Sequence, residues 1–123
     1  MARFVIGIGS NVSDKVDSIK DAFAWLSDIS KDFIASEIYI TKALNGIDDD
    51  YANAVCSCSL DQSLQDFNLL LKQYEKSRGR TPESKITGLI PIDLDIVIYN
   101  GEIVRQKDYI REYFQKGWKM IEK

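Results

Sequence analysis

The strongest strand signal in the chain is Ile90-Pro91-Ile92-Asp93-Leu94-Asp95-Ile96-Val97-Ile98-Tyr99. Most of its apolar residues are β-branched, and such residues favour the extended backbone. Asn100-Gly101 follows at once and is typical of a tight hairpin turn, so Glu102–Val104 is expected to return as a short strand. An apolar strand of this kind needs neighbours in a sheet and helices to cover it, and the preceding residues supply both.

Three further apolar runs predict strands over Arg3–Ile8, Phe33–Thr41 and Tyr51–Leu60. In the second run, alternation predicts two faces: Ile34, Ser36, Ile38 and Ile40 on one, and Phe33, Ala35, Glu37 and Tyr39 on the other. Residues 42–50 contain Asn-Gly and three consecutive aspartates, which predicts a loop.

Two amphipathic helices are expected between these strands. The first begins at Ser13 or Asp14 and ends near Ser30. The second begins at Asp61 or Ser63 and stops at Gly79. Their core-facing residues recur at helical spacing: Val16, Ile19, Phe23 and Leu26 in the first, and Leu64, Phe67, Leu71 and Tyr74 in the second. Residues 81–88 are predicted to be irregular, and 108–121 to form a third helix.

The predicted order β-α-β-β-α-β is the ferredoxin-like split pattern. It predicts an α+β sandwich in which an antiparallel sheet carries two helices on one face, with an extra C-terminal hairpin and helix. The 123 residues, predicted as one domain over 1–123, suit a single core.

Composition excludes several classes of function. The net charge of −3 lacks the basic surplus of a general nucleic-acid or acidic-membrane binder. No apolar run has the length of a membrane span, and residues 1–8 do not resemble a secretion signal, so a cytoplasmic location is expected. With no histidine, imidazole catalysis is excluded. Cys56 and Cys58 suit neither a disulfide nor a zinc site, and both are expected to be buried.

Asp93 and Asp95 interrupt the apolar strand at a spacing that places both carboxylates on one face. Two like charges side by side are costly unless something neutralises them. A magnesium ion would do so, because it prefers hard oxygen ligands and completes its shell with water and phosphate. A solvated face or a salt-bridged pair explains the same pattern, and both readings stay open.

Three other motifs also have two readings. Arg78 and Arg80 suit phosphates, but a structural Glu75–Arg78 pair explains them equally. Tyr51 and Asn53 share a strand face and suit a flat heterocycle, but ordinary packing explains them too. Residues 7–11 contain a lone Gly-x-Gly, which we interpret as a tight turn between strand and helix.

Taken in order, these segments resemble the 6-hydroxymethyl-7,8-dihydropterin pyrophosphokinase family over about the first hundred residues. The resemblance lies in an opening strand with Gly-Ser-Asn, a strand into a loop, an aromatic-x-Asn-Ala segment, a helix end and an Asp-Leu-Asp strand. The matching segments are Phe4–Asn11, Ser36–Thr41, Asp50–Val55, Glu75–Arg80 and Pro91–Tyr99.

The resemblance implies transfer of diphosphate from ATP to the hydroxymethyl oxygen of the pterin, in folate biosynthesis and with Mg²⁺. It assigns Asp93 and Asp95 to the metal, with Arg80 beside them in catalysis. It places Glu75, Arg80, Lys85 and Lys116 on the nucleotide side. It places Thr41, Leu44, Tyr51, Asn53 and Trp118 on the pterin side. Such a transfer depends on positioning and charge neutralisation, so it needs no imidazole.

The chain departs from the family pattern ahead of the Asp-Leu-Asp strand. Thr87 stands where the family has tryptophan, and Ile90 where it has an arginine. Lys42-Ala43 replaces a Pro-Pro-like pair, a Pro-His segment is missing, and Lys116-Gly117-Trp118 takes the place of Arg-x-Phe. An arginine at a phosphoryl-transfer site is worth about 10³–10⁵ in rate.

Two functions are therefore carried forward. One is a divergent pyrophosphokinase whose activity is impaired unless Lys85 or Lys116 substitutes for the missing arginine. The other is a non-catalytic relative that binds a pterin-like or nucleotide ligand, or a protein partner.

Overall fold

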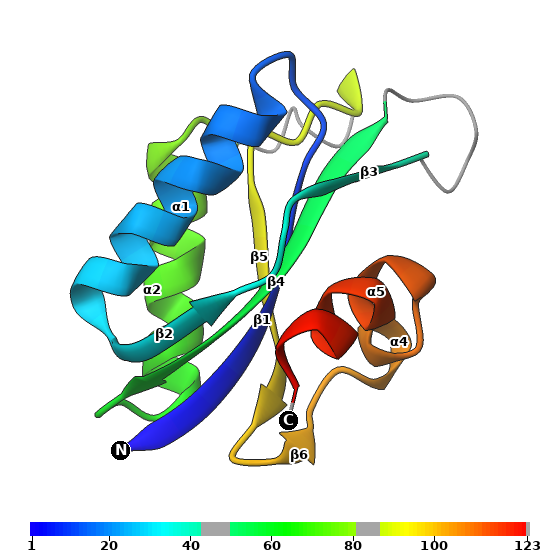
Figure 1. Cartoon of the computed structure of the whole chain (residues 1–123). Helices are drawn as coiled ribbons and strands as arrows, with labels where there is room; N and C mark the ends of the chain where they lie inside the picture. Colours follow the sequence, from blue (N-terminus) through cyan, green and yellow to red (C-terminus); the bar gives the residue numbers. More distant parts are fainter. Residues whose placement is uncertain (43–49, 81–86, 123) are drawn as a thin grey trace.

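The computed structural model describes residues 1–42, 50–80 and 87–122 (Figure 1). Its strands are β1 (Ala2–Ser10), β2 (Lys31–Ala35), β3 (Tyr39–Thr41), β4 (Tyr51–Leu60), β5 (Asp93–Tyr99) and β6 (Glu102–Ile103). Its helices include α1 (Lys15–Ile29), α2 (Leu64–Ser77), α4 (Gln106–Tyr109) and α5 (Glu112–Ile121). No helix within these described ranges is both long and apolar enough to cross a bilayer.

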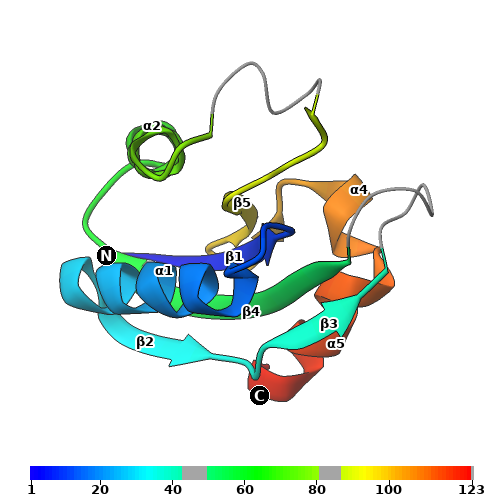
Figure 2. The ribbon, with the colours of Figure 1, turned by 90° about the horizontal axis from the view of Figure 1, so that it is seen from above.

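All strand pairs are antiparallel, in the order β2-β4-β1-β5-β6, and β3 extends the pairing along β4. Helices α1 and α2 pack on one face of the sheet and α5 on the other (Figure 2). The predicted ferredoxin-like α+β fold with an added C-terminal hairpin and helix is therefore confirmed.

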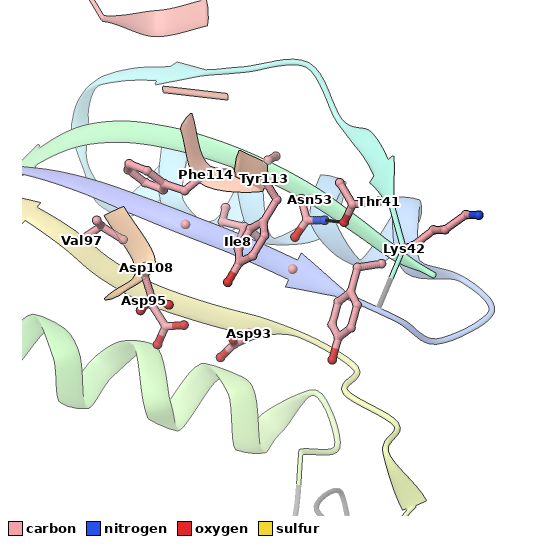
Figure 3. Close-up of a pocket in the computed structure, with 14 residues that line it drawn as sticks. Ile8, Thr41, Lys42, Asn53, Asp93, Asp95, Val97, Asp108, Tyr113 and Phe114 are labelled. Carbon is pink, nitrogen blue, oxygen red and sulfur yellow. Dashed lines mark hydrogen bonds between the residues drawn. The ribbon is translucent and has the colours of Figure 1, made fainter. Parts of the chain in front are cut away.

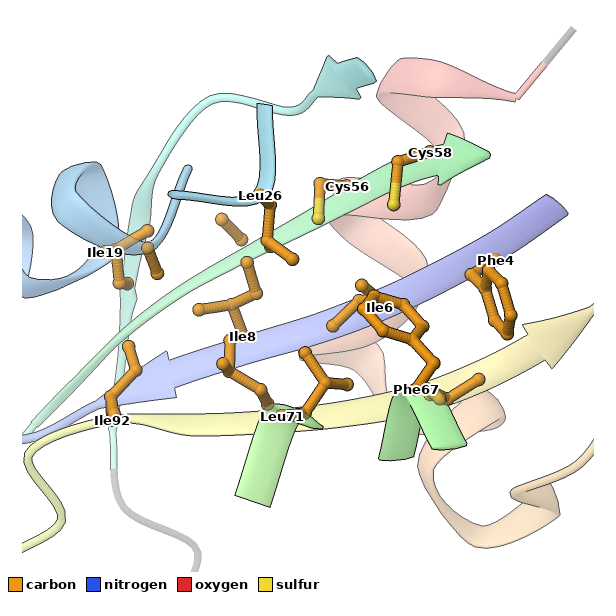
Figure 4. Close-up of a cluster of buried hydrophobic side chains, with 14 of the residues drawn as sticks. Phe4, Ile6, Ile8, Ile19, Leu26, Cys56, Cys58, Phe67, Leu71 and Ile92 are labelled. Carbon is orange, nitrogen blue, oxygen red and sulfur yellow. The ribbon is translucent and has the colours of Figure 1, made fainter. Parts of the chain in front are cut away.

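The larger core lies between the sheet and helices α1 and α2 (Figure 4). Phe4, Ile6 and Ile8 of β1 alternate onto this face and meet Phe67 and Leu71 of α2. Full burial of each such side chain stabilises the fold by about 1.5–3 kcal/mol. The same face buries both cysteines as free thiols, as the sequence predicted.

Turn and capping predictions are confirmed at three positions. The Ser63 hydroxyl caps α2 by accepting a hydrogen bond from the amide of Asp66 at 3.1 Å, whereas Asp14 lies at the N-cap position of α1 without a side-chain capping hydrogen bond. Gly79 ends α2 with φ +101°, a conformation that glycine adopts without strain. Asn100-Gly101 has positive φ at both residues, as a two-residue hairpin between β5 and β6 requires.

The strand predicted over Phe33–Thr41 is interrupted in its middle, so that prediction is wrong there. β2 pairs Ala35 with Cys56, and β3 pairs Tyr39 with Asn53. Ala35 and Tyr39 are four residues apart, whereas their partners on β4 are three residues apart. The extra residue between Ala35 and Tyr39 therefore forms a β-bulge.

Ser36 holds this bulge with its side chain. Its Oγ accepts a hydrogen bond from the amide of Val55 at 2.9 Å, in place of a backbone carbonyl. Because the extra residue reverses the alternation, Phe33 packs toward α1 while the Tyr39 hydroxyl donates to the carbonyl of Tyr113 on the opposite face. The prediction that Phe33 and Tyr39 share a face is therefore wrong.

The helix predicted over 108–121 is two helices. Arg111 lies between α4 and α5 with φ −68° and ψ 139°, an extended conformation that ends one helix and begins the next. The second helix places Phe114 against Val5, Val55 and Val97, and this contact forms a smaller core on the second face of the sheet.

Gly117 allows α5 to approach the sheet closely. A Cβ atom at this position would lie 2.6 Å from the Tyr39 hydroxyl oxygen and 2.6 Å from Cγ2 of Val55. Such distances are shorter than any real carbon contact, so a larger residue would have to push α5 outward.

We therefore expect Gly117→Ala to lower the free energy of unfolding by about 1–3 kcal/mol, as overpacking does. Urea denaturation measures this loss. Lys119→Ala, at an exposed position of the same helix, is the matched control and should change stability by less than about 0.5 kcal/mol. Equal stability of the two variants would show that α5 does not pack this closely.

Candidate functional site

A cavity of about 300 Å³ lies on the face of the sheet that carries α5 (Figure 3). Its walls come from the central strands, the end of β3 and the two C-terminal helices. Its lining residues are Gly7, Ile8, Gly9, Thr41, Lys42, Tyr51, Asn53, Ala54, Asp93, Asp95, Val97, Asp108, Tyr113 and Phe114.

Two glycines of β1 form the floor of this cavity. Gly9 pairs with Asp93 and Gly7 with Asp95 in the register of β1 and β5. A Cβ at Gly9 would lie 3.3 Å from Oδ1 of Asn53, and one at Gly7 would lie 3.5 Å from the ring of Phe114. The interpretation of residues 7–11 as a tight turn is wrong, since β1 continues through Ser10. The missing side chains leave the space above the strand open.

Ser10 and Asn11 hold the segment that leads into β5. Asn11 is 1 % exposed, and its amide side chain donates to the carbonyl of Gly88 at 2.6 Å and accepts from the amide of Ile90 at 2.6 Å. The Ser10 hydroxyl donates to the carbonyl of Pro91 at 2.7 Å. These bonds fix residues 88–91 next to the carboxylates that follow them.

Asp93 and Asp95 both point into the cavity from β5 (Figure 3). The structure shows the salt-bridged reading of this pair, since each carboxylate has a cationic partner. Arg80 Nη1 lies 2.5 Å from Oδ1 of Asp93, and Lys72 Nζ lies 3.3 Å from Oδ1 of Asp95.

The cationic partners of Asp95 do not fully offset its burial and its carboxylate neighbour. Burial raises the pKa of this carboxyl above its ordinary value, and the charge of Asp93 raises it further. Lys72 and Arg105 oppose the rise only in part. The carboxylate pair is therefore a place where added positive charge would be favourable.

Glu75 lies beneath this pair and organises its cations. It is 4 % exposed, and its Oε2 accepts from the amide of Leu94 at 2.7 Å and from Lys72 Nζ at 3.0 Å. Its Oε1 lies 3.4 Å from Arg80 Nη1. The alternative Glu75–Arg78 pair does not form, because Arg78 bonds Asp21 at 2.6 Å.

The end of the cavity near Asn53 carries uncharged polar groups together with Lys42. Asn53 is 5 % exposed, and its Nδ2 donates to Oγ1 of Thr41 (Figure 3). The ring of Tyr51 lines the same end. The structure thus brings together three of the residues placed on the pterin side. They lie across β1 from the carboxylates, since Gly9 pairs with Asn53 on one side and with Asp93 on the other.

Other predicted site residues lie elsewhere. Trp118 stacks on Phe114 at 6.5 Å between ring centroids and does not line the cavity. Lys116 sits over the ring of Tyr39, with Nζ 5.2 Å from its centroid. Leu44 and Lys85 lie outside the described residues.

Lys72, Arg105 and Asp108 belong to the site but were not among the residues predicted for it. Asp108 lines the cavity and is paired with Arg105, whose guanidinium also lies 3.9 Å from Asp95. Their sequence positions, on a helix face and after a hairpin, are ordinary for surface charges, so only the fold reveals the cluster.

The donor set suits one kind of metal ion. Among the residues that the structure describes, no three Asp, Glu, Cys or His side chains come together as a complete metal site. Two carboxylates are nevertheless what magnesium commonly takes from a protein when phosphate oxygens and water supply the rest. The residues present therefore fit Mg²⁺ that is bound together with a nucleotide.

Comparison with known sequences finds relatives that cover most of this chain. The family model described as 7,8-dihydro-6-hydroxymethylpterin-pyrophosphokinase (HPPK) matches residues 5–123. A 2-amino-4-hydroxy-6-hydroxymethyldihydropteridine pyrophosphokinase of Aquifex aeolicus is 32% identical over 109 residues, which cover 87% of this chain and 67% of the relative. The protein of the same name in Helicobacter pylori is 30% identical over 115 residues, covering 86% and 68%. The folic acid synthesis protein FOL1 of Dictyostelium discoideum is 31% identical over 106 residues, which cover 84% of this chain but only 16% of that protein.

Proposed function

This chain belongs to the 7,8-dihydro-6-hydroxymethylpterin pyrophosphokinase family, whose activity is diphosphate transfer in folate biosynthesis, and we propose that the transfer takes place in the cavity above Gly7 and Gly9. The substrates are ATP and 6-hydroxymethyl-7,8-dihydropterin. One observation carries the assignment of the site: a single cavity joins a carboxylate pair flanked by cations to an amide, a hydroxyl and a phenol. Transfer between two substrates needs the carboxylate end for the nucleotide and the polar end for the pterin.

In the proposed reaction the hydroxymethyl oxygen of the pterin attacks the β-phosphorus of ATP. The bond between that phosphorus and the oxygen bridging it to the α-phosphorus breaks, AMP leaves, and the hydroxyl proton passes to solvent. Asp93 and Asp95 would hold Mg²⁺, which supplies positive charge to the phosphate oxygens. Arg80, 2.5 Å from Asp93, adds a second positive charge at the same end.

Glu75 acts as a positioning residue in this proposal. Both of its oxygens are engaged, so it keeps Lys72 and Arg80 beside the carboxylates and ties α2 to the edge of β5. The sequence resemblance placed it on the nucleotide side. Its burial supports an indirect role there, through the cations that it holds.

The pterin would occupy the end of the cavity near Asn53. The Asn53 side chain can meet the polar edge of a flat heterocycle, and Thr41 fixes its orientation. Tyr51 offers an aromatic ring beside it. Tyr113 and Phe114 also line the cavity and would supply the second aromatic contact, since Trp118, which the sequence resemblance placed on the pterin side, does not reach it.

This placement is tested by binding. A dihydropterin should quench the intrinsic fluorescence of the wild-type chain in a saturable way, both alone and with an unreactive ATP analogue. Asn53→Ala should weaken binding by about tenfold, since an unpaired ligand edge costs roughly 1–3 kcal/mol. Asn68→Ala, at an exposed position on α2, is the matched control and should leave the affinity unchanged. Equal affinities for the wild type and Asn53→Ala would remove the pterin from this end of the cavity.

Turnover is expected to be slow. The positions where the family places tryptophan and arginine hold Thr87 and Ile90, and neither brings a positive charge. This departure also favours the second candidate, a relative that binds the same ligands without transferring diphosphate. The two candidates share a binding site and differ in whether AMP is released.

A further inference from the structure

Lys72 is a cation of the site for which neither the sequence resemblance nor the proposed reaction gives a role. It projects from α2, which lies along β5 (Figure 1). Its Nζ has three oxygen partners: Oε2 of Glu75 at 3.0 Å, the carbonyl of Leu94 at 3.0 Å and Oδ1 of Asp95 at 3.3 Å. An ammonium group has three N–H donors, so these contacts use all of them.

Two of those partners are fixed by the fold. Glu75 is buried, and the Leu94 carbonyl belongs to the backbone of a central strand. β6 pairs with β5 only at Ile98 and Tyr99 and does not reach Leu94. On that side of the strand, Glu75 of α2 accepts from the Leu94 amide and Lys72 of α2 donates to the Leu94 carbonyl. The Lys72 charge therefore stays beside Asp95 whatever else Asp95 binds.

Arg80 is held less firmly. Its contact with Asp93 is short, at 2.5 Å, but its contacts with Glu75 and with the carbonyl of Ile92 are 3.4 Å and 3.5 Å. Arg80 therefore depends mainly on Asp93 for its position, whereas Lys72 is also held at 3.0 Å by Glu75 and by the carbonyl of Leu94.

A fixed positive charge next to a carboxylate affects two kinds of ligand in opposite ways. It repels a divalent cation that approaches the same carboxylate, and it attracts the anionic phosphates of a nucleotide. From the proposed function above, we infer that Lys72 is a built-in competitor for Asp95, which disfavours a free divalent cation and favours one that arrives with phosphate. The carboxylate pair would then respond to the metal–nucleotide complex and not to the metal alone.

The test measures binding of Mn²⁺ alone to the full chain by electron paramagnetic resonance. Lys72→Gln removes the charge but keeps a donor for the Leu94 carbonyl. We expect it to bind Mn²⁺ about tenfold more tightly than the wild type, the size of one partly solvated charge interaction. The same variant should bind metal-free ATP at least about threefold more weakly. Lys76→Gln, an exposed position on the same helix, is the matched control and should change neither affinity by more than about twofold.

Unchanged or weaker Mn²⁺ binding by Lys72→Gln would overturn the inference. Lys72→Arg keeps the charge and should bind Mn²⁺ as the wild type does; a tenfold gain in this variant would also overturn it. Asp93→Asn separates the inference from the proposed function on which it rests. If that variant binds Mn²⁺ with ATP as well as the wild type does, the metal is not at the carboxylate pair and both proposals fail. If it binds less and Lys72→Gln equals the wild type, only the inference fails.

Discussion

Replacing Asp95 with asparagine should lower the rate of diphosphate transfer at least a hundredfold and, in the absence of metal, make the protein more stable to heat. The first effect follows from the loss of a carboxylate that the proposal gives to Mg²⁺. Removing one group that stabilises a transition-state charge typically costs about 10²–10³ in rate. A steady-state assay of AMP release measures this effect.

The second effect follows from the raised pKa of Asp95, which comes from burial and from the charge of Asp93. A carboxyl whose pKa is higher in the folded state contributes stability below its unfolded pKa of about 4, and that contribution is lost as the pH rises through the folded value. Asparagine resembles the protonated form at every pH. The variant should therefore unfold at a higher temperature than the wild type at pH 7, and the difference should shrink as the pH falls toward 4.

Asp28→Asn, at an exposed position on α1, is the control for both effects and should change neither. Added Mg²⁺ and ATP should reverse the order of stability, because ligands stabilise only a protein that binds them. A variant that keeps full activity would remove Asp95 from the metal site. A variant that loses activity and also loses stability at pH 7 would show that the carboxylate supports the fold.

Ile90→Arg should raise the rate of diphosphate transfer by about 10³, the lower end of what an arginine contributes to phosphoryl transfer. Ile90 stands where the family places an arginine just ahead of its carboxylate pair. Its backbone is held by two hydrogen bonds to Asn11, so a new side chain would start from a fixed position three residues before β5 begins. Restored positive charge there would add to that of Arg80 beside the carboxylate pair.

Leu89→Arg is the control, since it adds the same charge at an exposed neighbouring position, and it should raise the rate by less than about threefold. An equal rate in Ile90→Arg and the wild type would mean that the missing arginine is not what limits turnover. If the wild type already turns over within the usual enzyme range of about 1–10³ s⁻¹, the expectation of slow turnover is wrong. Another cation, Lys85 or Lys116, would then supply the positive charge of the missing arginine.

Local patterns in the sequence predict most of the fold because local physics sets them. The apolar spacing of Ile19 and Leu26, the cap at Ser63 and the turn at Asn100-Gly101 act within a few residues, and each is found in the structure. The bulge at Ser36 is different, since it depends on a hydrogen bond to Val55 that is distant in sequence. Alternation alone could not predict that reversal of faces.

The residues of the candidate site also divide into those that the sequence reveals and those that only the fold reveals. Asp93 and Asp95 are visible in the sequence because charge in an apolar strand is unusual, and Asn53 because it lies in a strand that is otherwise largely apolar. Gly7 and Gly9 matter only because they lie opposite those aspartates across the sheet. Lys72 is held in the site by the carbonyl of Leu94, which is 22 residues away in the sequence. No local sequence pattern connects these two residues.

Diphosphate transfer by this chain is tested most directly by product analysis. The chain is incubated with Mg²⁺, ATP and 6-hydroxymethyl-7,8-dihydropterin, and the products are separated and identified by mass. We expect AMP and the pterin diphosphate in equal amounts, formed slowly and only when all three components are present. Saturable binding of both substrates with no AMP after many hours, or release of ADP in place of AMP, would contradict the claim.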